Sequence, residues 1–294
     1  MAAGARSATV IRAPGGASSP PTTSATRAQP LAARRILVTR PRAQAPELAE
    51  RLAALGAEAI TAPAIRIVPP VDTRPLDDAC AAAASFAWIV FTSANAVDAF
   101  LDRLIDGGGT AAALDEVRIC AVGPATGARL AQHGLTVDLT PADHRGEGVS
   151  AALREGRDLR GMPILLPRAD IARPALSDAL RAAGAEVSEV TAYRTVAVAG
   201  WPALPVREML RQRRIDAVTF TSASAVRSAV QSLGAAQAAG LLGATVVASI
   251  GPVTAREARQ LGLQTTVMPS SYTTRALVQA LADHFAGTPA ADST

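Results

Sequence analysis

The sequence contains no lysine, so all 29 of its basic side chains are arginines. This excludes a mechanism that needs a lysine amine, such as a Schiff base with a carbonyl substrate or with pyridoxal phosphate. The two cysteines, Cys80 and Cys120, are too few for a disulfide framework. The three histidines are scattered and give no metal-ligand spacing with them. Nothing in these counts indicates a metal.

Long apolar runs and a basic stripe are also missing. No run approaches the ~18 apolar residues that a bilayer-spanning helix needs, so we expect no membrane partner. The formal net charge is +4, but residues 1–35 carry five arginines and no acid, which leaves the rest of the chain at −1. A nearly neutral body argues against nucleic acid as a partner.

The N-terminal residues 1–35 are rich in Ala, Ser, Thr, Pro and Gly and have no apolar period, so they are expected to form a disordered tail. Their composition also fits an organellar transit peptide or a wrongly assigned start codon. No secretory apolar region follows the Arg34–Arg35 pair. We expect a cytoplasmic protein, with a second short disordered tail at residues 286–294.

Four segments recur in the same order about 128 positions further along the chain. FTSANAV at residues 91–97 returns as FTSASAV at 220–226, and AVGPATGARLAQHGL at 121–135 returns as SIGPVTAREARQLGL at 249–263. The other two pairs are RLAALGAE with ALRAAGAE, and ILVTRP with ILLPRA. Solenoid repeats are ~20 to 50 residues long, so this longer unit indicates two similar lobes.

Within each copy, short apolar runs alternate with segments of helical periodicity. The expected strands are residues 36–38, 58–62, 87–92, 117–122 and 136–139, then 163–167, 186–190, 215–221, 244–250 and 265–268. Continuous apolar strands that alternate with amphipathic helices are typical of a parallel sheet covered on both faces. The sequence therefore predicts an α/β protein whose two lobes are each a five-stranded, doubly wound parallel sheet.

Two divisions of the chain into lobes fit this repeat. A plain tandem arrangement places the boundary in the polar segment 140–161. In the other arrangement, the matched segments 63–75 and 191–205 cross between the lobes, and their alternating apolar residues pair as a two-stranded hinge. The pattern alone does not choose between these divisions.

Polar residues follow the third and fourth strands of each copy. Ser93 ends one third strand, and Ser222 and Ser224 end the other, while Thr126 and Thr254 follow the Gly-Pro turns after the fourth strands. Ligands of doubly wound sheets bind at the carboxyl ends of the strands, where helix N-termini present free amide groups. Each of these residues alone is also an ordinary helix cap. The near identity of both copies favours a shared site for anions.

Two further side chains are candidates. Arg168 ends a strand at the same edge and is suited to bind a carboxylate, although a surface arginine explains it equally well; Arg40 is its counterpart in the other copy. Tyr193 lies in the segment of the possible hinge, where its phenol could act as a hydrogen-bond donor or weak acid, or pack between the lobes.

Seven segments together resemble a known family. They are ILVTRP, WIVFTSANAV, ICAVGPATGARL, LLPRAD, TAYRTV, DAVTFTSASAV and ASIGPVTAREA. In this order and spacing they resemble the uroporphyrinogen-III synthase family over residues 35–285. The resemblance implies two α/β lobes joined by a two-stranded hinge, and it favours the crossing arrangement, with residues 36–70 plus 197–285 in one lobe and 71–196 in the other.

The resemblance also implies a reaction, without cofactor or metal, on hydroxymethylbilane, a linear tetrapyrrole with eight carboxylates. The family eliminates its terminal hydroxyl as water and closes the ring through a spiro intermediate that inverts ring D. By similarity, Tyr193 assists departure of the hydroxyl, and Ser93, Thr126, Ser222, Ser224 and Thr254 line the site; Arg168 is the candidate for a substrate carboxylate. We expect a monomer.

Two other functions compete with this interpretation. A non-catalytic two-lobed binding protein would share the duplicated sheets and hinge, but would more naturally carry a signal peptide or a DNA-binding headpiece, and neither is visible. A two-lobed nucleotide-sugar transferase is usually longer than 294 residues and has an acidic metal-binding motif, which is not evident here.

Overall fold

The computed structural model describes residues 29–287. Residues 1–28 and 288–294, which hold most of the two predicted tails, lie outside the described residues. The last seven residues of the predicted N-terminal tail are described, and Leu31 among them is fully buried beneath the first sheet. The packed chain therefore begins before residue 36, because the apolar side chain of Leu31, ahead of Arg34 and Arg35, belongs to the core.

The first lobe is built on four parallel strands, in the order β2 (Glu58–Thr61), β1 (Arg35–Val38), β8 (Ala217–Phe220) and β9 (Val246–Ser249). On one face of this sheet, Ile36 and Val38 pack against α1 (Ala45–Ala53) and α11 (Thr274–Ala286). On the other, Leu37 and Val218 pack against four helices. These are α7 (Leu204–Arg211), α8 (Ala223–Leu233), α9 (Ala235–Leu241) and α10 (Pro252–Gln260). Helices on both faces explain the uninterrupted apolar strands.

The second lobe has strands in the order β3 (Ile65–Val68), β7 (Glu186–Ala197), β6 (Pro163–Ala169), β4 (Trp88–Phe91) and β5 (Arg118–Ala121). Ile89 and Phe91 face three helices, α2 (Arg74–Ala81), α3 (Ala94–Asp106) and α4 (Pro124–Gln132). The short helix η1 (Ala83–Ser85) follows α2, and η2 (Ala111–Leu114) follows α3. Trp88 and Val90 face α5 (Gly146–Arg154) and α6 (Ala175–Ala182). This sheet is also covered on both sides.

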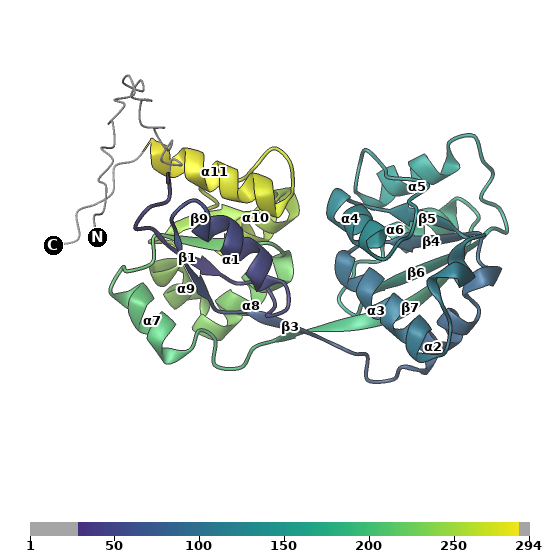
Figure 1. Ribbon diagram of the computed structural model, residues 1–294, viewed down its shortest axis with the longest axis horizontal. Coiled ribbons are helices and arrows are strands. Elements are labelled where there is room, and N and C mark those ends of the chain that lie inside the picture. The colour runs from purple at the N-terminus through teal and green to yellow at the C-terminus, as the bar shows by residue number, and fades with distance from the viewer. Residues whose placement is uncertain (1–28, 288–294) are drawn as a thin grey trace, which may run out of the picture.

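The chain crosses between the lobes in β3 and β7, which pair as antiparallel strands from Ile65 opposite Ala197 to Val68 opposite Arg194. Figure 1 shows two separate bodies with this pair running between them. The beginning and the end of the described chain, purple and yellow, lie together in one body, whereas its middle forms the other (Figure 1). Segments far apart in the sequence therefore share the first lobe.

The fifth strand predicted for each sheet is reduced to a single bridge. Leu139 pairs only with Cys120, and Val267 only with Ala248. In the second lobe, the carboxylate of Asp138 accepts the backbone N–H of Ile119 at 2.7 Å. A side chain thus takes one position of the backbone ladder beside this shortened strand. The second sheet reaches five strands through the antiparallel β3 instead.

Both sheets contain one place where the chain leaves neighbouring strands in opposite directions. In the first lobe it lies between β1 and β8, and in the second between β6 and β4. Such a topological switch point is where doubly wound sheets bind ligands, beyond the carboxyl ends of the strands. It is therefore the place to look for functional side chains.

Candidate functional site

Two serines occupy equivalent positions beside the switch points. Ser93 caps α3 by accepting the N–H of Ala96 at 3.1 Å, and Ser222 caps α8 by accepting the N–H of Ala225 at 3.2 Å. Their backbone angles agree within one degree, with φ −158° and −157° and ψ 153°. Both serines therefore satisfy a free helix amide in the same way, and any further role depends on what else their hydroxyls contact.

Tyr193 is the partner of Ser93. Its hydroxyl lies 3.1 Å from the hydroxyl of Ser93, although the two residues are 100 positions apart. The side chain is 7% exposed and packs in the core beneath α3. A register shift between Arg168 and Ala169 places Tyr193 opposite Ala169, at the carboxyl end of β6. The phenol is thus held at the N-terminus of α3, where the helix dipole favours developing negative charge.

The equivalent position in the first lobe holds a pair of hydroxyls. Ser222 and Ser224 lie 3.0 Å apart. Asn95, the counterpart of Ser224 in the other copy, makes a different contact: its side-chain carbonyl accepts a hydrogen bond from the amide of Gln44, which precedes α1 in the first lobe. This contact joins the turn before α1 in the first lobe to the N-terminus of α3 in the second.

Thr126 and Thr254 lie in the first turns of α4 and α10, each 4% exposed. Each helix is preceded by a glycine in extended conformation, Gly123 or Gly251. A Cβ atom on Gly251 would lie 3.1 Å from the ring of Tyr272, whereas one on Gly123 would lie 4.0 Å from the ring of His144. The two turns thus have similar backbone conformations, but the Tyr272 ring lies closer to Gly251 than the His144 ring lies to Gly123.

Arg168 is already engaged by the protein. Its guanidinium forms an ion pair with Glu189 and donates to the carbonyl of Ala172 at 2.5 Å and to Ser177 at 3.4 Å. Burial raises the pKa of Glu189, but hydrogen bonds from Arg181 and Ser177 together with nearby arginine charges outweigh it and hold the pKa below its ordinary value. A ligand carboxylate would have to exchange with that of Glu189.

Arg40 occupies the position in the first lobe that Arg168 occupies in the second. It follows β1 and donates to Glu47 at 3.2 Å and to Gln44 at 3.3 Å. Its Nε is buried and has no hydrogen-bond partner. Burial lowers the pKa of the Arg40 guanidinium, against the opposing charge and hydrogen bond of Glu47. The signal in the sequence was its position in the repeat, 128 residues before Arg168.

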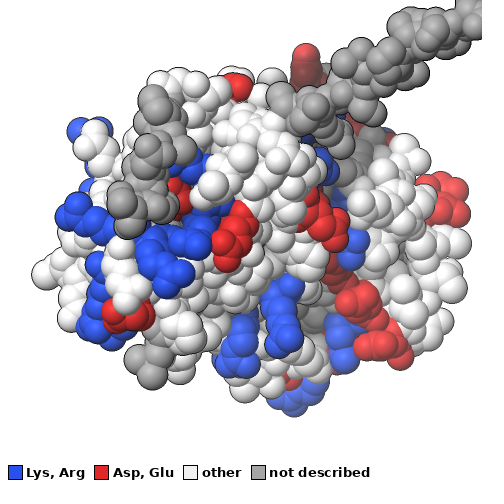
Figure 2. Space-filling model, turned by 60° about the vertical axis from the view of Figure 1, so that its left-hand side comes forward, with Lys and Arg blue, Asp and Glu red and all other residues white. Residues whose placement is uncertain are grey.

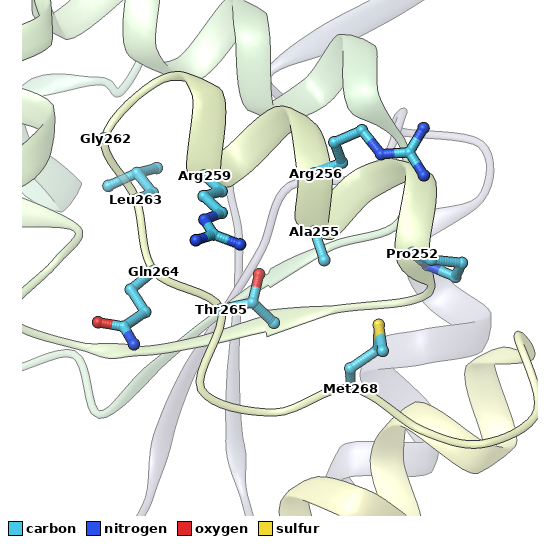
Figure 3. A pocket seen from close by; sticks show the side chains of 9 residues that line it. All are labelled: Pro252, Ala255, Arg256, Arg259, Gly262, Leu263, Gln264, Thr265 and Met268. Atoms are coloured by element: carbon cyan, nitrogen blue, oxygen red, sulfur yellow. The ribbon is translucent and has the colours of Figure 1, made fainter.

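A surface hollow of about 760 Å³ lies between α10 and the segment that follows it, and none of the candidate residues lines it. Figure 3 shows Arg259 pointing toward Thr265 across this hollow, with Met268 and Pro252 at one end. An adjoining hollow of about 660 Å³ shares Gly262, Gln264 and Thr265 with it. Both follow the outer edge of the first lobe, so neither is centred on the candidate residues.

The remaining surface gives no contrary indication. Figure 2 shows arginine and acidic side chains mixed on one face of the molecule. Ion pairs of the described residues include Arg35 with Glu58 at 2.8 Å. Between residues 29 and 287, no group of three or more His, Cys, Asp and Glu side chains could hold a metal ion. None of the helices described in that range is long and apolar enough to cross a membrane.

Comparisons with known proteins agree with this architecture. The family model of uroporphyrinogen-III synthase HemD matches residues 46–279. A uroporphyrinogen-III synthase of Synechococcus elongatus is 33% identical over 260 residues, covering 86% of this chain and 96% of the relative. A putative uroporphyrinogen-III synthase of Methanothermobacter thermautotrophicus is 32% identical over 248 residues, covering 83% and 96%.

Solved structures show the same fold. A mutant uroporphyrinogen III synthase of Thermus thermophilus superposes with a TM-score of 0.61 at 19% identity, covering 87% of this chain and all of that one. A uroporphyrinogen-III synthetase of Helicobacter pylori gives a TM-score of 0.53 at 17% identity, covering 85% of this chain and 99% of that one. The two sheets and these structural matches thus define a two-lobed α/β protein with hydroxyl side chains at the ends of its strands. The chain belongs to the uroporphyrinogen-III synthase family, whose members are cyclising lyases of tetrapyrrole biosynthesis, and a non-catalytic binding protein is not favoured.

Proposed function

We propose that this chain converts hydroxymethylbilane into uroporphyrinogen III, with loss of water and inversion of ring D. Membership of the family supports the reaction. The observation that carries the mechanism is the contact between the hydroxyls of Tyr193 and Ser93 at the N-terminus of α3. It supplies a proton donor beside a site suited to negative charge.

The substrate would bind between the lobes through its carboxylates. The N-termini of α3, α4, α8 and α10 present free amides at the carboxyl ends of the sheets, where they attract anions without lysine. In this proposal the binding residues are Ser93, Thr126, Arg168, Ser222, Ser224 and Thr254. The hydrogen bond between Gln44 and Asn95 supports a shared site, because it joins turns of both lobes.

Tyr193 is proposed to start the reaction. As the C–O bond breaks, the lone pair of the terminal pyrrole nitrogen forms a ring C=N bond and the ring double bonds shift to give the exocyclic C=C bond of an azafulvene. The hydroxyl takes the phenolic proton and leaves as water. Ser93 and the α3 N-terminus stabilise the phenolate until it takes up the pyrrole N–H proton. Ring D then attacks through its substituted carbon, and the spiro intermediate fragments and recloses. Holding the two ends in this orientation is the main task of the protein.

The proposal includes the domain organisation. One lobe comprises residues 36–70 with 197–285, together with the packed residues 29–35 that precede them. The other comprises residues 71–196, and β3 with β7 forms the hinge. Matching strand orders support an origin by duplication of a unit of about 128 residues, since β2-β1-β8-β9 corresponds strand by strand to β7-β6-β4-β5. We also propose that the enzyme is a cytoplasmic monomer that needs no cofactor and acts on a small molecule, not on nucleic acid.

The deciding experiment is an isomer analysis. Hydroxymethylbilane is generated in the presence of the purified protein, the product is oxidised, and the uroporphyrin isomers are separated by chromatography. Predominance of isomer III is the expected result, because uncatalysed closure gives isomer I. Isomer I alone in the presence of folded protein would overturn the proposal.

A further inference from the structure

Arg40 occupies the place in the first lobe that a ligand of a doubly wound sheet would approach. It lies two residues beyond the end of β1, and β1 and β8 form the topological switch point of their sheet. Ser222 and Ser224 follow the neighbouring strand β8. An arginine and a hydroxyl pair thus flank the same strand ends.

The guanidinium of Arg40 is incompletely satisfied. Nη1 donates to Glu47 at 3.2 Å and Nη2 to Gln44 at 3.3 Å, while Nε is buried without an acceptor. The side chain is 16% exposed, whereas the carboxylate-bearing side chain of Glu47 is 49% exposed. A buried donor without a partner destabilises this arrangement, so moving to a better acceptor would cost little. An ion pair with an exposed glutamate is also weak.

Two contacts of the network indicate which way Arg40 faces. Gln44, which accepts from Arg40, donates in turn to Asn95 at the N-terminus of α3 in the second lobe. Glu47 accepts from Thr274 at 2.7 Å and from Arg51 at 3.2 Å, so it keeps two other partners if Arg40 leaves. Arg40 therefore borders the contact between the lobes. If its guanidinium left Glu47, that carboxylate would still accept hydrogen bonds from Thr274 and Arg51.

We infer that Arg40 binds a carboxylate of the linear tetrapyrrole substrate, exchanging its contacts with Glu47 and Gln44 for a two-point hydrogen bond through Nε and a terminal nitrogen. A planar guanidinium fits a carboxylate in this bidentate way. The inference rests on the proposed function, because it takes the substrate from there. Binding at Arg40 also removes one partner of Gln44, which links substrate binding to the contact between the lobes.

The test compares three variants in steady-state kinetics with hydroxymethylbilane, scoring isomer III. Arg40→Met is expected to raise KM roughly 10- to 100-fold, the value of a charged hydrogen bond, with kcat changed much less. Glu47→Gln is expected to lower KM or leave it unchanged, because it frees Arg40. Arg51→Met removes another partner of Glu47, farther along α1, and serves as the control with an unchanged KM.

The outcomes separate this inference from the proposed function. If the wild-type protein yields only isomer I, the proposed function fails; if it yields isomer III and Arg40→Met keeps the wild-type KM, the inference alone fails. Equal increases of KM in Arg40→Met and Glu47→Gln would show that the pair is merely structural, which also overturns it. Should Arg40→Met not fold, Arg40→Lys keeps the charge but loses the planar, two-point guanidinium. Its KM is then expected to exceed that of Arg51→Met, and an equal KM would overturn the inference.

Discussion

The two lobes present the same backbone with different chemistry at the ends of β4 and β8. In the second lobe the cap of the following helix, Ser93, contacts the phenol of Tyr193, whereas in the first lobe Ser222 contacts another hydroxyl, that of Ser224. The cap geometry is otherwise indistinguishable. The serine of a duplicated turn can therefore keep its hydrogen bond to the helix amide in both copies. The other contact of its hydroxyl depends on which residue lies opposite it in each lobe.

A similar difference separates the turns before α4 and α10. Tyr272 rests on Gly251 in the first lobe, and His144 lies farther from Gly123 in the second. Proton donation is thus expected from one lobe and ligand binding from both.

The largest effect is expected for Tyr193→Phe. The variant keeps the buried ring but loses the hydroxyl near Ser93, so kcat should fall by about 10²-fold or more, the lower range for general acid catalysis. The matched control is Tyr272→Phe, which removes the other tyrosine hydroxyl of the chain. We expect its kcat to equal that of the wild type. Equal losses in both variants, or none in either, would remove the asymmetry.

The capping serines give the second comparison. Ser93→Ala and Ser222→Ala each remove one cap, so each should lower the free energy of unfolding by about 1 kcal/mol. Ser93→Ala also removes the hydroxyl that contacts the phenol of Tyr193, so it should reduce kcat. Ser222→Ala leaves that contact intact and should mainly raise KM. Urea unfolding and steady-state kinetics on the same preparations check both parts. A loss of kcat in Ser222→Ala that matches Ser93→Ala would contradict the division of roles.

The glycines before α4 and α10 provide a third comparison. Gly251→Ala places a methyl 3.1 Å from the Tyr272 ring, which must shift, whereas Gly123→Ala meets nothing closer than 4.0 Å. Both lose a good capping residue, so the difference between them isolates the ring contact. Gly251→Ala should be less stable than Gly123→Ala by about 1 kcal/mol in urea unfolding. Identical unfolding curves would show that Tyr272 moves freely.

The smallest effect is on stability in acid, and it concerns Glu47 and Glu189, the carboxylates that pair with Arg40 and Arg168. The pKa of each carboxyl is held below its ordinary value of 4.5, because hydrogen bonds and arginine charges outweigh the effect of burial, which raises it. A lowered pKa in the folded state contributes stability that is present above about pH 4.5 and is lost as the pH falls. Glu47→Gln and Glu189→Gln should each flatten the fall of stability in acid. Unfolding curves between pH 3 and 6 measure this, and slopes equal to that of the wild type would contradict it.

The sequence allowed the strands and caps to be predicted, because burial on both faces leaves unbroken apolar runs such as Trp88–Phe91. It did not reveal that the fifth strand of each copy would be reduced to a single bridge, or that Asp138 would take a ladder hydrogen bond beside one of them. The proximity of Tyr193 to Ser93 depends on a register shift in β6, which leaves no pattern in the sequence. The contact of Gln44 with Asn95, like the unpaired Nε of Arg40, depends on how two lobes and individual rotamers are placed.

The strand β7 belongs to two pairings at once. Tyr193 is its last residue paired with β6, and Arg194 is the first paired with β3, which leads into the other lobe. An extended strand transmits rotation along its length, so a swing of one lobe about this crossing would twist the peptide beside the phenol. Under the proposed function, the orientation of the Tyr193 phenol would therefore depend on the angle between the two lobes.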